Sequence, residues 1–195
     1  MKTPPELSFP TVNFIQFHNA NRNIFIHSTR SGRDWPAIMD FEPTIQWFQG
    51  DSGLSSHLVI GGRIARMVDD DDSAIHAGGA NNLKSLAIEI VQPKIDTPFI
   101  PASLDLAAWS CAVWCLKYGI PPVRIFSQTE VGIIGHEDSE QGRSSGKSDP
   151  GPLFPWNMFI KRVKTLMLFG SLEPHILKGD YLKILGILRY VGVEV

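Results

Sequence analysis

The sequence has few cysteines and no long apolar run. Its two cysteines, Cys111 and Cys115, lie four positions apart in the apolar segment 104–118, where a helix places both on one face. A disulfide framework is therefore excluded, and without a C-x-x-C motif we expect two buried core thiols rather than a metal or redox pair. No window reaches the roughly 18 uninterrupted apolar residues of a membrane-spanning helix, so no integral membrane segment is expected.

An excess of positive charge is also missing. The chain has 18 Lys and Arg against 20 Asp and Glu, a formal net charge of -2, so we do not expect nucleic acid as a partner. The N-terminus, MKTPPE, lacks the apolar core of a signal peptide, which predicts synthesis in the cytoplasm without one. With 195 residues, 43% of them hydrophobic, the chain is expected to fold as one domain and to be a monomer.

The spacing of apolar residues predicts strands and helices in alternation. Helices are predicted at 35–48 and 104–118, where apolar residues recur three and four positions apart, and Gly119 ends the second. Strands are predicted at 23–26, 56–60, 63–68, 85–90 and 132–135. The acidic run 69–72 is expected to be a solvated turn, and 137–148 a polar loop. The pattern is typical of an α/β fold, a single mixed central β-sheet flanked by helices.

Two of the predicted strands end at a histidine. His27 follows the first strand, His136 follows the last, and Asp149 ends the polar loop just before a rigid Pro-Gly-Pro. If the two strands are neighbours, two imidazoles and one carboxylate converge at one sheet edge, which is the composition of an open catalytic zinc site. Glu89, an acid in an otherwise apolar strand, either faces water on an alternating face or projects into this site.

Six segments occur in an order that resembles one family. They are 24–30 (IFIHSTR), 55–60 (SSHLVI), 75–78 (IHAG), 82–89 (NLKSLAIE), 135–138 (GHED) and 146–152 (GKSDPGP). Together they resemble the type 2 N-acetylmuramoyl-L-alanine amidases, the superfamily that also contains the peptidoglycan recognition proteins. The similarity covers roughly residues 20–160, and the K-x-D-P-G element is its most specific part.

The resemblance implies a Zn2+ enzyme and a role for each matched residue. His27, His136 and Asp149 match the three zinc ligands. Glu89 matches the acid that takes a proton from the attacking water and passes it to the leaving nitrogen. Lys147 matches the lysine that helps zinc to stabilise the tetrahedral oxyanion.

Other matched positions imply contacts with the substrate. His76 and Asn82 match positions that border the substrate groove, although a histidine between loop residues can equally be structural. His57 has strand-like apolar neighbours and is predicted to belong to the core. Stem peptides are anionic, so we also expect an arginine near the groove to bind their carboxylates; the candidates are Arg30, Arg33 and Arg63.

The activity implied by the resemblance is zinc-dependent hydrolysis of the amide between N-acetylmuramic acid and L-alanine of the peptidoglycan stem peptide. The expected partners are therefore peptidoglycan or muropeptides. The form of segment 143–149 resembles phage and prophage members, which favours a bacteriolytic endolysin that acts on the cell wall. A cytoplasmic amidase that recycles anhydro-muropeptides and a non-catalytic peptidoglycan-binding module remain open. A serine hydrolase, which requires a G-x-S-x-G elbow between a strand and a helix, is not expected.

The chain is expected to divide near residue 160. Residues 1–160 are predicted to form the zinc amidase catalytic domain, and 161–195 a C-terminal tail. The tail has mixed apolar periodicity, with 6 Lys and Arg against 3 Asp and Glu. This composition fits a helix packed on the domain, the favoured alternative, or an appendage that targets the cell wall or membrane.

Overall fold

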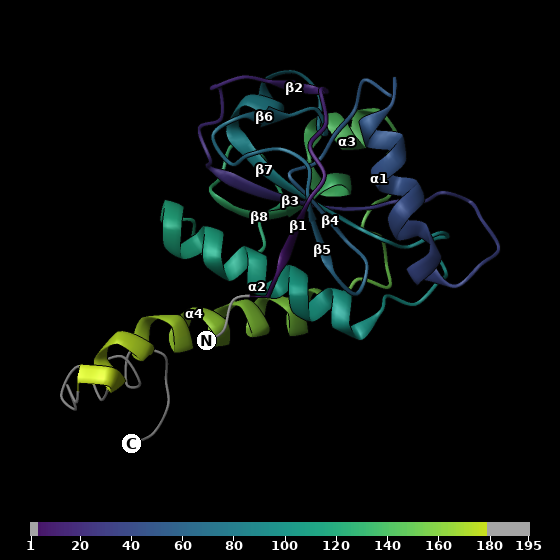
Figure 1. The fold of residues 1–195 in the computed structure, drawn as a ribbon. Helices are drawn as coiled ribbons and strands as arrows, with labels where there is room; N and C mark the ends of the chain where they lie inside the picture. Colours follow the sequence, from purple (N-terminus) through teal and green to yellow (C-terminus); the bar gives the residue numbers. More distant parts are fainter. Residues whose placement is uncertain (1–3, 179–195) are drawn as a thin grey trace.

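The computed structural model describes residues 4–178, and of 171–178 only the course of the backbone. Its centre is a six-stranded mixed sheet with strand order β1-β5-β4-β7-β3-β8. The strands are β1 (Glu6–Ser8), β3 (Asn23–Ser28), β4 (Leu58–Ile60), β5 (Ile64–Arg66), β7 (Ser85–Ile90) and β8 (Gly132–Gly135). Helices flank the sheet, so the predicted α/β class is confirmed (Figure 1).

The parallel centre of the sheet brings the ends of three strands together. Strand β3 pairs in parallel with β7 on one side and with β8 on the other. Such strands are buried on both faces and therefore read as continuous apolar runs. The register sets Glu89 opposite His27 and Gly135 opposite Ile26, so His136 follows directly at the same edge. In parallel sheets, ligands bind outside this carboxyl edge of the strands.

The helices cover both faces of the sheet. Helix α1 (Phe41–Gln49) packs Phe41, Ile45 and Phe48 against one face, where Val59 of β4 is buried. Helices α2 (Pro101–Tyr118) and α4 (Trp156–Lys178) pack against each other and cover the other face, below the sheet in Figure 1. The remaining helical segments are η1 (Ala37–Asp40), η2 (Gly79–Lys84), η3 (His136–Asp138) and α3 (Glu140–Ser144).

The helix predicted at 35–48 is shorter than expected. The structure has a 3-10 turn, η1, followed by α1, which starts at Phe41. Pro43 explains the break, because proline has no N–H to donate and its ring clashes with the carbonyl four residues earlier. It is tolerated only within the first turn of an α-helix, where N–H groups have no partner in any case.

The prediction of core thiols in α2 is confirmed. Cys111 and Cys115 are both free and buried, and burial raises the pKa of Cys115 to about 12. The helix begins at Pro101, three residues before the predicted start, and Gly119 ends it in the left-handed region at φ 67°. A thiol with so high a pKa is inert as a nucleophile at neutral pH.

Helix α4 runs across residue 160, where we predicted a boundary. Its residues Phe159 and Val163, on either side of that position, are both buried in the main core. The division into domain and tail stays a prediction, and residues 179–195 of the tail lie outside the described part of the chain. Within residues 4–178, the helices are too short or too polar to cross a bilayer.

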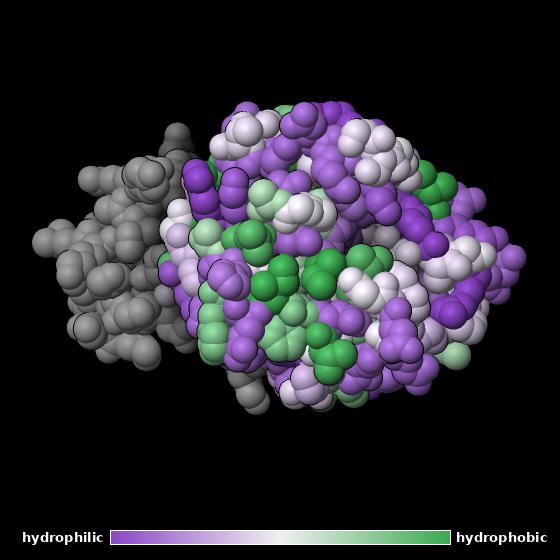
Figure 2. All heavy atoms as spheres, turned by 90° about the horizontal axis from the view of Figure 1, so that it is seen from above, coloured by the Kyte–Doolittle hydropathy of each residue, from purple (hydrophilic) through white to green (hydrophobic). Residues whose placement is uncertain are grey.

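A small ribbon lies above the sheet. Strands β2 (Phe14–Ile15) and β6 (Ser73–Ala74) pair antiparallel. The segment around β2 carries exposed apolar side chains, with Val12 and Phe17 the most exposed. Seen from above, green apolar patches interrupt a mainly purple surface (Figure 2). The N-terminal segment was not predicted to contain strands, and β1 and β2 are both exposed edge strands.

The acidic run 69–72 is not a simple solvated turn, as we had predicted. The Asp70 carboxylate accepts hydrogen bonds from Trp114 Nε1 at 3.1 Å, Lys117 Nζ at 2.9 Å and Tyr118 Oη at 2.9 Å, all on α2. It also pairs with Arg66 of β5. Burial alone would raise the pKa of Asp70, but Arg66, Lys117 and Tyr118 lower it to about 2. Asp70 therefore ties the sheet to α2.

We expect Asp70→Ala to lower the free energy of unfolding by about 2 to 3 kcal/mol at neutral pH, because Arg66 would lose a partly buried partner. Asp71→Ala, at an exposed position in the same run, is the matched control and should change it by less than about 0.5 kcal/mol. Since the folded-state pKa is depressed, the contribution is present above the ordinary pKa and is lost as the pH falls toward 2. Urea unfolding of both variants at pH values between about 7 and 3 tests this; equal stabilities would contradict it.

Candidate metal centre

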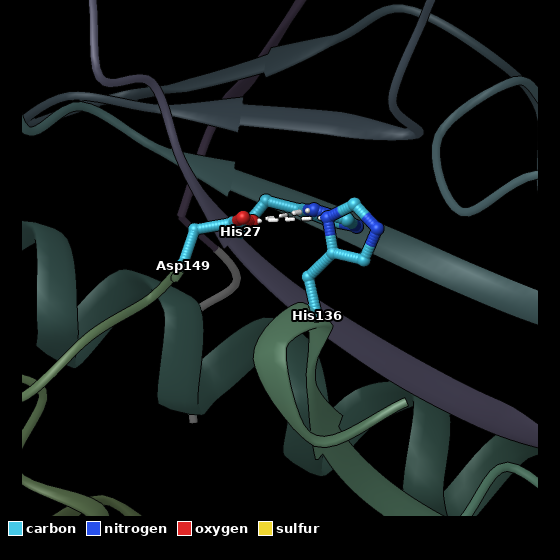
Figure 3. Close-up of side chains that lie close together, drawn as sticks. All are labelled: His27, His136 and Asp149. Carbon is cyan, nitrogen blue, oxygen red and sulfur yellow. Dashed lines mark hydrogen bonds and ion pairs between the residues drawn. The ribbon is translucent and has the colours of Figure 1, made fainter. Parts of the chain in front are cut away.

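Three predicted metal ligands converge at the carboxyl edge of the sheet. His27 comes from the end of β3, His136 opens η3 directly after β8, and Asp149 lies in the loop after α3. All three are buried, and they point toward one another in Figure 3. Asp149 Oδ2 lies 2.9 Å from His27 Nδ1 and 3.3 Å from His136 Nδ1. The candidate ligand atoms all lie within 4.8 Å of one another.

The donor set fits a divalent metal ion. Ligands at about 2.0 to 2.1 Å from a tetrahedral zinc ion are roughly 3.3 Å apart, close to the two measured separations. Burial lowers the pKa of His27, which favours the neutral imidazole. Burial alone would raise the pKa of Asp149, but hydrogen bonds with His136 and His27 hold it far below its usual range. A neutral imidazole and an ionised carboxylate are the protonation states that bind metal.

Arg30 holds the loop that carries Asp149. Its guanidinium donates to the carbonyl oxygen of Pro150 at 2.8 Å and to the side chain of Gln92. The backbone of Arg30 adopts a left-handed conformation at φ 50°. Residues other than glycine seldom adopt this conformation unless the surrounding structure holds them in it. Gly151 keeps the approach open, because a Cβ there would lie 2.4 Å from the Arg30 guanidinium. Arg30, which lies just after β3, thus fixes the loop that carries the Asp149 carboxylate.

The predicted polar loop 137–148 contains two short helical turns, η3 and α3. Ser139 begins α3 by accepting a hydrogen bond from the N–H of Gly142 at 2.9 Å, a standard N-cap. The N–H of Lys147 then donates to the Gly142 carbonyl at 2.8 Å. This turn places Lys147, whose side chain is exposed, on the wall of the cavity beside the three ligands.

The segment GRSSG at 142–146 does have the spacing G-x-S-x-G, which we had not expected. In the structure, Ser144 lies at the exposed end of α3 rather than between a strand and a helix. Its hydroxyl donates to the Gln141 carbonyl at 2.9 Å. A nucleophile elbow needs a serine on a strand-to-helix turn with a histidine in reach, so this segment is not one.

One cavity of about 310 Å³ joins the ligands to most other predicted site residues. It is lined by His27, Ser28, Thr29, Arg30, Trp47, Phe48, Leu54, Ser55, Ile75, His76, Glu89, His136, Gly146, Lys147, Ser148 and Asp149. Asn82 is absent from this wall. Its buried amide Oδ1 accepts from the backbone N–H groups of His76 at 3.1 Å and Ala77 at 2.8 Å, so it shapes the His76 segment instead.

Glu89 projects into the cavity and not into water on the far face. Leu86, Ile88 and Ile90 of β7 belong to the core under α2, so Glu89 lies on the opposite face, with His27. Burial raises the pKa of Glu89 well above its usual range, and the charge of Asp149 raises it further. A carboxyl group with a raised pKa beside a metal site can both take and give a proton near neutral pH.

His57 is a core residue, as predicted, and lies outside the cavity. It is fully buried, accepts a hydrogen bond from the N–H of Ala87 at 3.0 Å and lies 3.0 Å from the carbonyl of Asp72. Burial lowers its pKa to about 4. The ring is therefore neutral at physiological pH and supports the sheet.

The sequence analysis missed the apolar side of the cavity. Trp47 and Phe48 of α1 line it, together with Leu54 and Ile75. A signal for Trp47 was available, because it falls outside the apolar stripe of α1 and is 53% exposed. Tryptophan is enriched at interfaces, because it combines a large apolar surface with one hydrogen-bond donor. The loop residues carried no comparable pattern.

Comparisons with solved structures give the fold. The Staphylococcus aureus hydrolase AmiA, solved with its ligand, matches with a TM-score of 0.66 and 16% identity, over 88% of this chain and 87% of that chain. A mutant endolysin from Bacillus subtilis matches at 0.59 and 19% identity, over 82% and 99%. The amidase LysC from Clostridium intestinale URNW matches at 0.57 and 18% identity, over 83% and 99%. At these identities the likeness establishes architecture only.

Sequence comparison gives the family. No curated protein matches the chain significantly. The family model Amidase_2, described as N-acetylmuramoyl-L-alanine amidase, matches residues 17–152, which is most of the chain and includes every predicted site residue. The chain therefore belongs to the Amidase_2 family of N-acetylmuramoyl-L-alanine amidases, as its motifs predicted.

Proposed function

We propose that this amidase uses zinc to cleave the amide between the lactyl carbonyl of N-acetylmuramic acid and L-alanine of the stem peptide. The observation that carries the proposal is the buried set of His27, His136 and Asp149, with Glu89 in the same cavity. Two imidazoles and one carboxylate leave a coordination position open, which distinguishes catalytic from structural zinc sites. A peptidoglycan-binding module has no need for this complete set.

Each side chain has a distinct task in the proposed reaction. Zinc held by the three ligands supplies Lewis acidity toward the carbonyl and makes water available as a nucleophile near neutral pH. Glu89 accepts the proton of the attacking water and delivers it to the leaving nitrogen. Lys147 brings positive charge to the oxygen on which negative charge develops. Holding these groups on three adjacent strand ends and one fixed loop limits the reorganisation that the reaction requires.

We further propose that the protein is an endolysin that acts on intact cell walls. The form of segment 143–149 supports this role. Two proteins of similar structure, one from Bacillus subtilis and one from Clostridium intestinale, are also named as endolysins. An enzyme that recycles anhydro-muropeptides cleaves the same amide bond. The two roles therefore differ in the size of the substrate, which is the intact cell wall for an endolysin and a soluble fragment for a recycling enzyme. Activity on whole sacculi separates them.

The test is mass spectrometry of the products released from purified sacculi, with and without a zinc chelator. We expect stem peptides that begin at L-alanine, intact glycan strands, and loss of release when the metal is removed. Release from soluble anhydro-muropeptides alone would replace the endolysin role by recycling. No release from either substrate, with the protein still bound to sacculi, would leave a binding module.

Of the three arginines considered for the stem-peptide carboxylates, the structure favours Arg33. A second cavity of about 350 Å³ shares Glu89 with the first and is lined by Arg33 and Trp47. Arg33 is about half exposed, and its contact with Asp40 is long, at 3.5 Å. Arg30 is already engaged by the loop carbonyls, and Arg63 pairs with Glu42 on the surface.

Arg33→Ala is expected to raise KM for anionic stem-peptide substrates by about 3- to 10-fold with little change in kcat, because it removes binding shared by substrate and transition state. Arg63→Ala is the matched control and should leave both constants unchanged. Kinetics on a soluble muropeptide measure both variants. If Arg63→Ala raises KM as much as Arg33→Ala, general surface charge rather than this cavity binds the substrate.

A further inference from the structure

A chain of side chains leads from the metal centre into the protein. His27 Nε2, on the ring edge away from Asp149, lies 3.0 Å from His76 Nδ1. His76 Nε2 lies 3.1 Å from Ser85 Oγ. The hydroxyl of Ser85 then donates to the backbone carbonyl of Asn81 at 2.6 Å. The chain thus ends on a group that can only accept a hydrogen bond.

That last group orders the protons of the chain once a metal ion takes the place of a proton on His27 Nδ1. Ser85 has one O–H, and the Asn81 carbonyl takes it, so Ser85 Oγ accepts the N–H of His76 Nε2. His76 Nδ1 then carries a lone pair and accepts the N–H of His27 Nε2. In the metal-free protein, the Asp149 carboxylate lies 2.9 Å from His27 Nδ1 and competes with His76 for the single proton of the neutral His27 ring. A metal ion at Nδ1 removes this competition and leaves the proton on Nε2, where His76 accepts it.

The buried surroundings of these side chains preserve the order of donors and acceptors in the chain. Ser85 is fully buried at the start of β7, and His27 is 4% exposed, so the hydrogen-bond partners of Ser85 and of His27 Nε2 are protein groups. The His76 backbone is fixed by the Asn82 amide. His76 is itself held at both ring nitrogens, by His27 Nε2 on one side and Ser85 Oγ on the other.

We propose that His76 and Ser85 are positioning residues that hold His27 in the tautomer whose Nδ1 lone pair binds the metal. The proposal deepens the function proposed above and rests on it. Both ring nitrogens of His76 are occupied by protein groups, so His76 acts through His27 rather than by hydrogen bonding to substrate. A ligating histidine whose second nitrogen is fixed in this way binds metal more tightly, since the correct tautomer and orientation are set in advance.

The decisive variant is Ser85→Ala, which removes the acceptor for His76 and lets both rings take the other tautomer. We expect zinc affinity, measured by competition with a chromophoric chelator at fixed pH, to fall about 10-fold or more. Ser56→Ala is the matched control, because Ser56 is also fully buried and its hydroxyl also donates to a backbone carbonyl, that of Leu58 at 3.1 Å. It should bind zinc like the wild type. Ser85→Thr, which keeps the hydroxyl, should recover most of the lost affinity.

Long-range proton–nitrogen NMR of the histidine rings reads the tautomer directly and does not depend on activity. The zinc-loaded wild-type protein should show His27 and His76 both protonated at Nε2, and zinc-loaded Ser85→Ala should show a mixture at His76. Zinc-loaded wild-type protein with either ring protonated at Nδ1, or Ser85→Ala with unchanged affinity, would overturn the proposal even if one variant fails to fold. Equal loss in Ser56→Ala would also overturn it, by tracing the effect to packing. A wild-type chain that binds no zinc would instead overturn the proposed function.

Discussion

Glu89→Gln is expected to lower kcat about a thousandfold while zinc remains bound. Glu89 sits at the carboxyl end of β7, opposite His27 in the sheet register, and shares its cavity with all three ligands. Glutamine preserves the size and polarity of the side chain but cannot take a proton from water or pass one to the leaving nitrogen. The loss therefore falls on turnover, whereas the ligand set is untouched.

The environment of Glu89 supports this role. Burial raises the pKa of its carboxyl group well above the usual range, and Asp149 adds to the rise, while Arg30 and Lys147 oppose it. A general base that must later act as an acid works best when its pKa is near the working pH. A carboxylate on the solvated face of the sheet would keep an ordinary pKa and serve poorly as the acid.

Three quantities decide the outcome: kcat, KM and zinc bound per chain. The control is Glu130→Gln, at an exposed position before β8 and therefore at the opposite end of that strand from His136, which should match the wild type in all three. A Glu89→Gln enzyme that retains full turnover would contradict the role of Glu89 in proton transfer. A variant that loses zinc together with turnover would make Glu89 a part of the metal centre instead.

The parts of this site that were predictable from sequence are those encoded by strand ends. The run Gly132–Gly135 is apolar throughout and Ser85–Ile90 is apolar except for Ser85 and Glu89, and the structure gives both as strands with the predicted bounds. A residue directly after such a strand must emerge at the sheet edge, which placed His136. What spacing alone left open was whether the two histidine strands are neighbours, and the parallel pairing of β3 with β8 settles that.

The errors have physical causes that act through tertiary contacts. Strand β1, with the sequence ELS, has no apolar periodicity and exists because it pairs in parallel with β5. Asp70 looked solvated within a run of four acids, because nothing local reveals the four donors that surround it. The proline effect on α1 was different, since Pro43 is visible in the sequence and its rule is local.

The hydrogen-bonded chain behind His27 was out of reach of sequence reasoning. His76 lies 49 positions from His27, and its side chain reaches that ring from the segment between β6 and η2, where it also contacts Ser85 at the start of β7, the strand paired with β3. The resemblance to the family implied that His76 borders the substrate groove. The structure does place it on the cavity wall, with both ring nitrogens turned to protein partners.

Asp149→Ala is expected to abolish zinc binding and hydrolysis together. Asp149 Oδ2 lies within hydrogen-bonding distance of the imidazoles of His27 and His136, and its carboxylate supplies the only negative charge among the three proposed ligands. Without it, two neutral imidazoles remain, which bind zinc far more weakly than a set that includes a carboxylate. The zinc content should fall from about one ion per chain to nearly none after dialysis, and activity should fall with it.

The two variants separate metal binding from proton transfer, provided that the Asp149→Ala protein folds. Wild-type protein should gain thermal stability with added zinc, because an ion that binds only the folded state stabilises it by mass action. Asp149→Ala should unfold at the same temperature with or without zinc, whereas Glu89→Gln should keep the full zinc-dependent shift. An Asp149→Ala protein that shows the wild-type shift and still cleaves sacculi would mean that another side chain completes the metal centre. A wild-type zinc-dependent shift in Glu89→Gln, together with loss of turnover, is what a proton-transferring residue outside the ligand set requires.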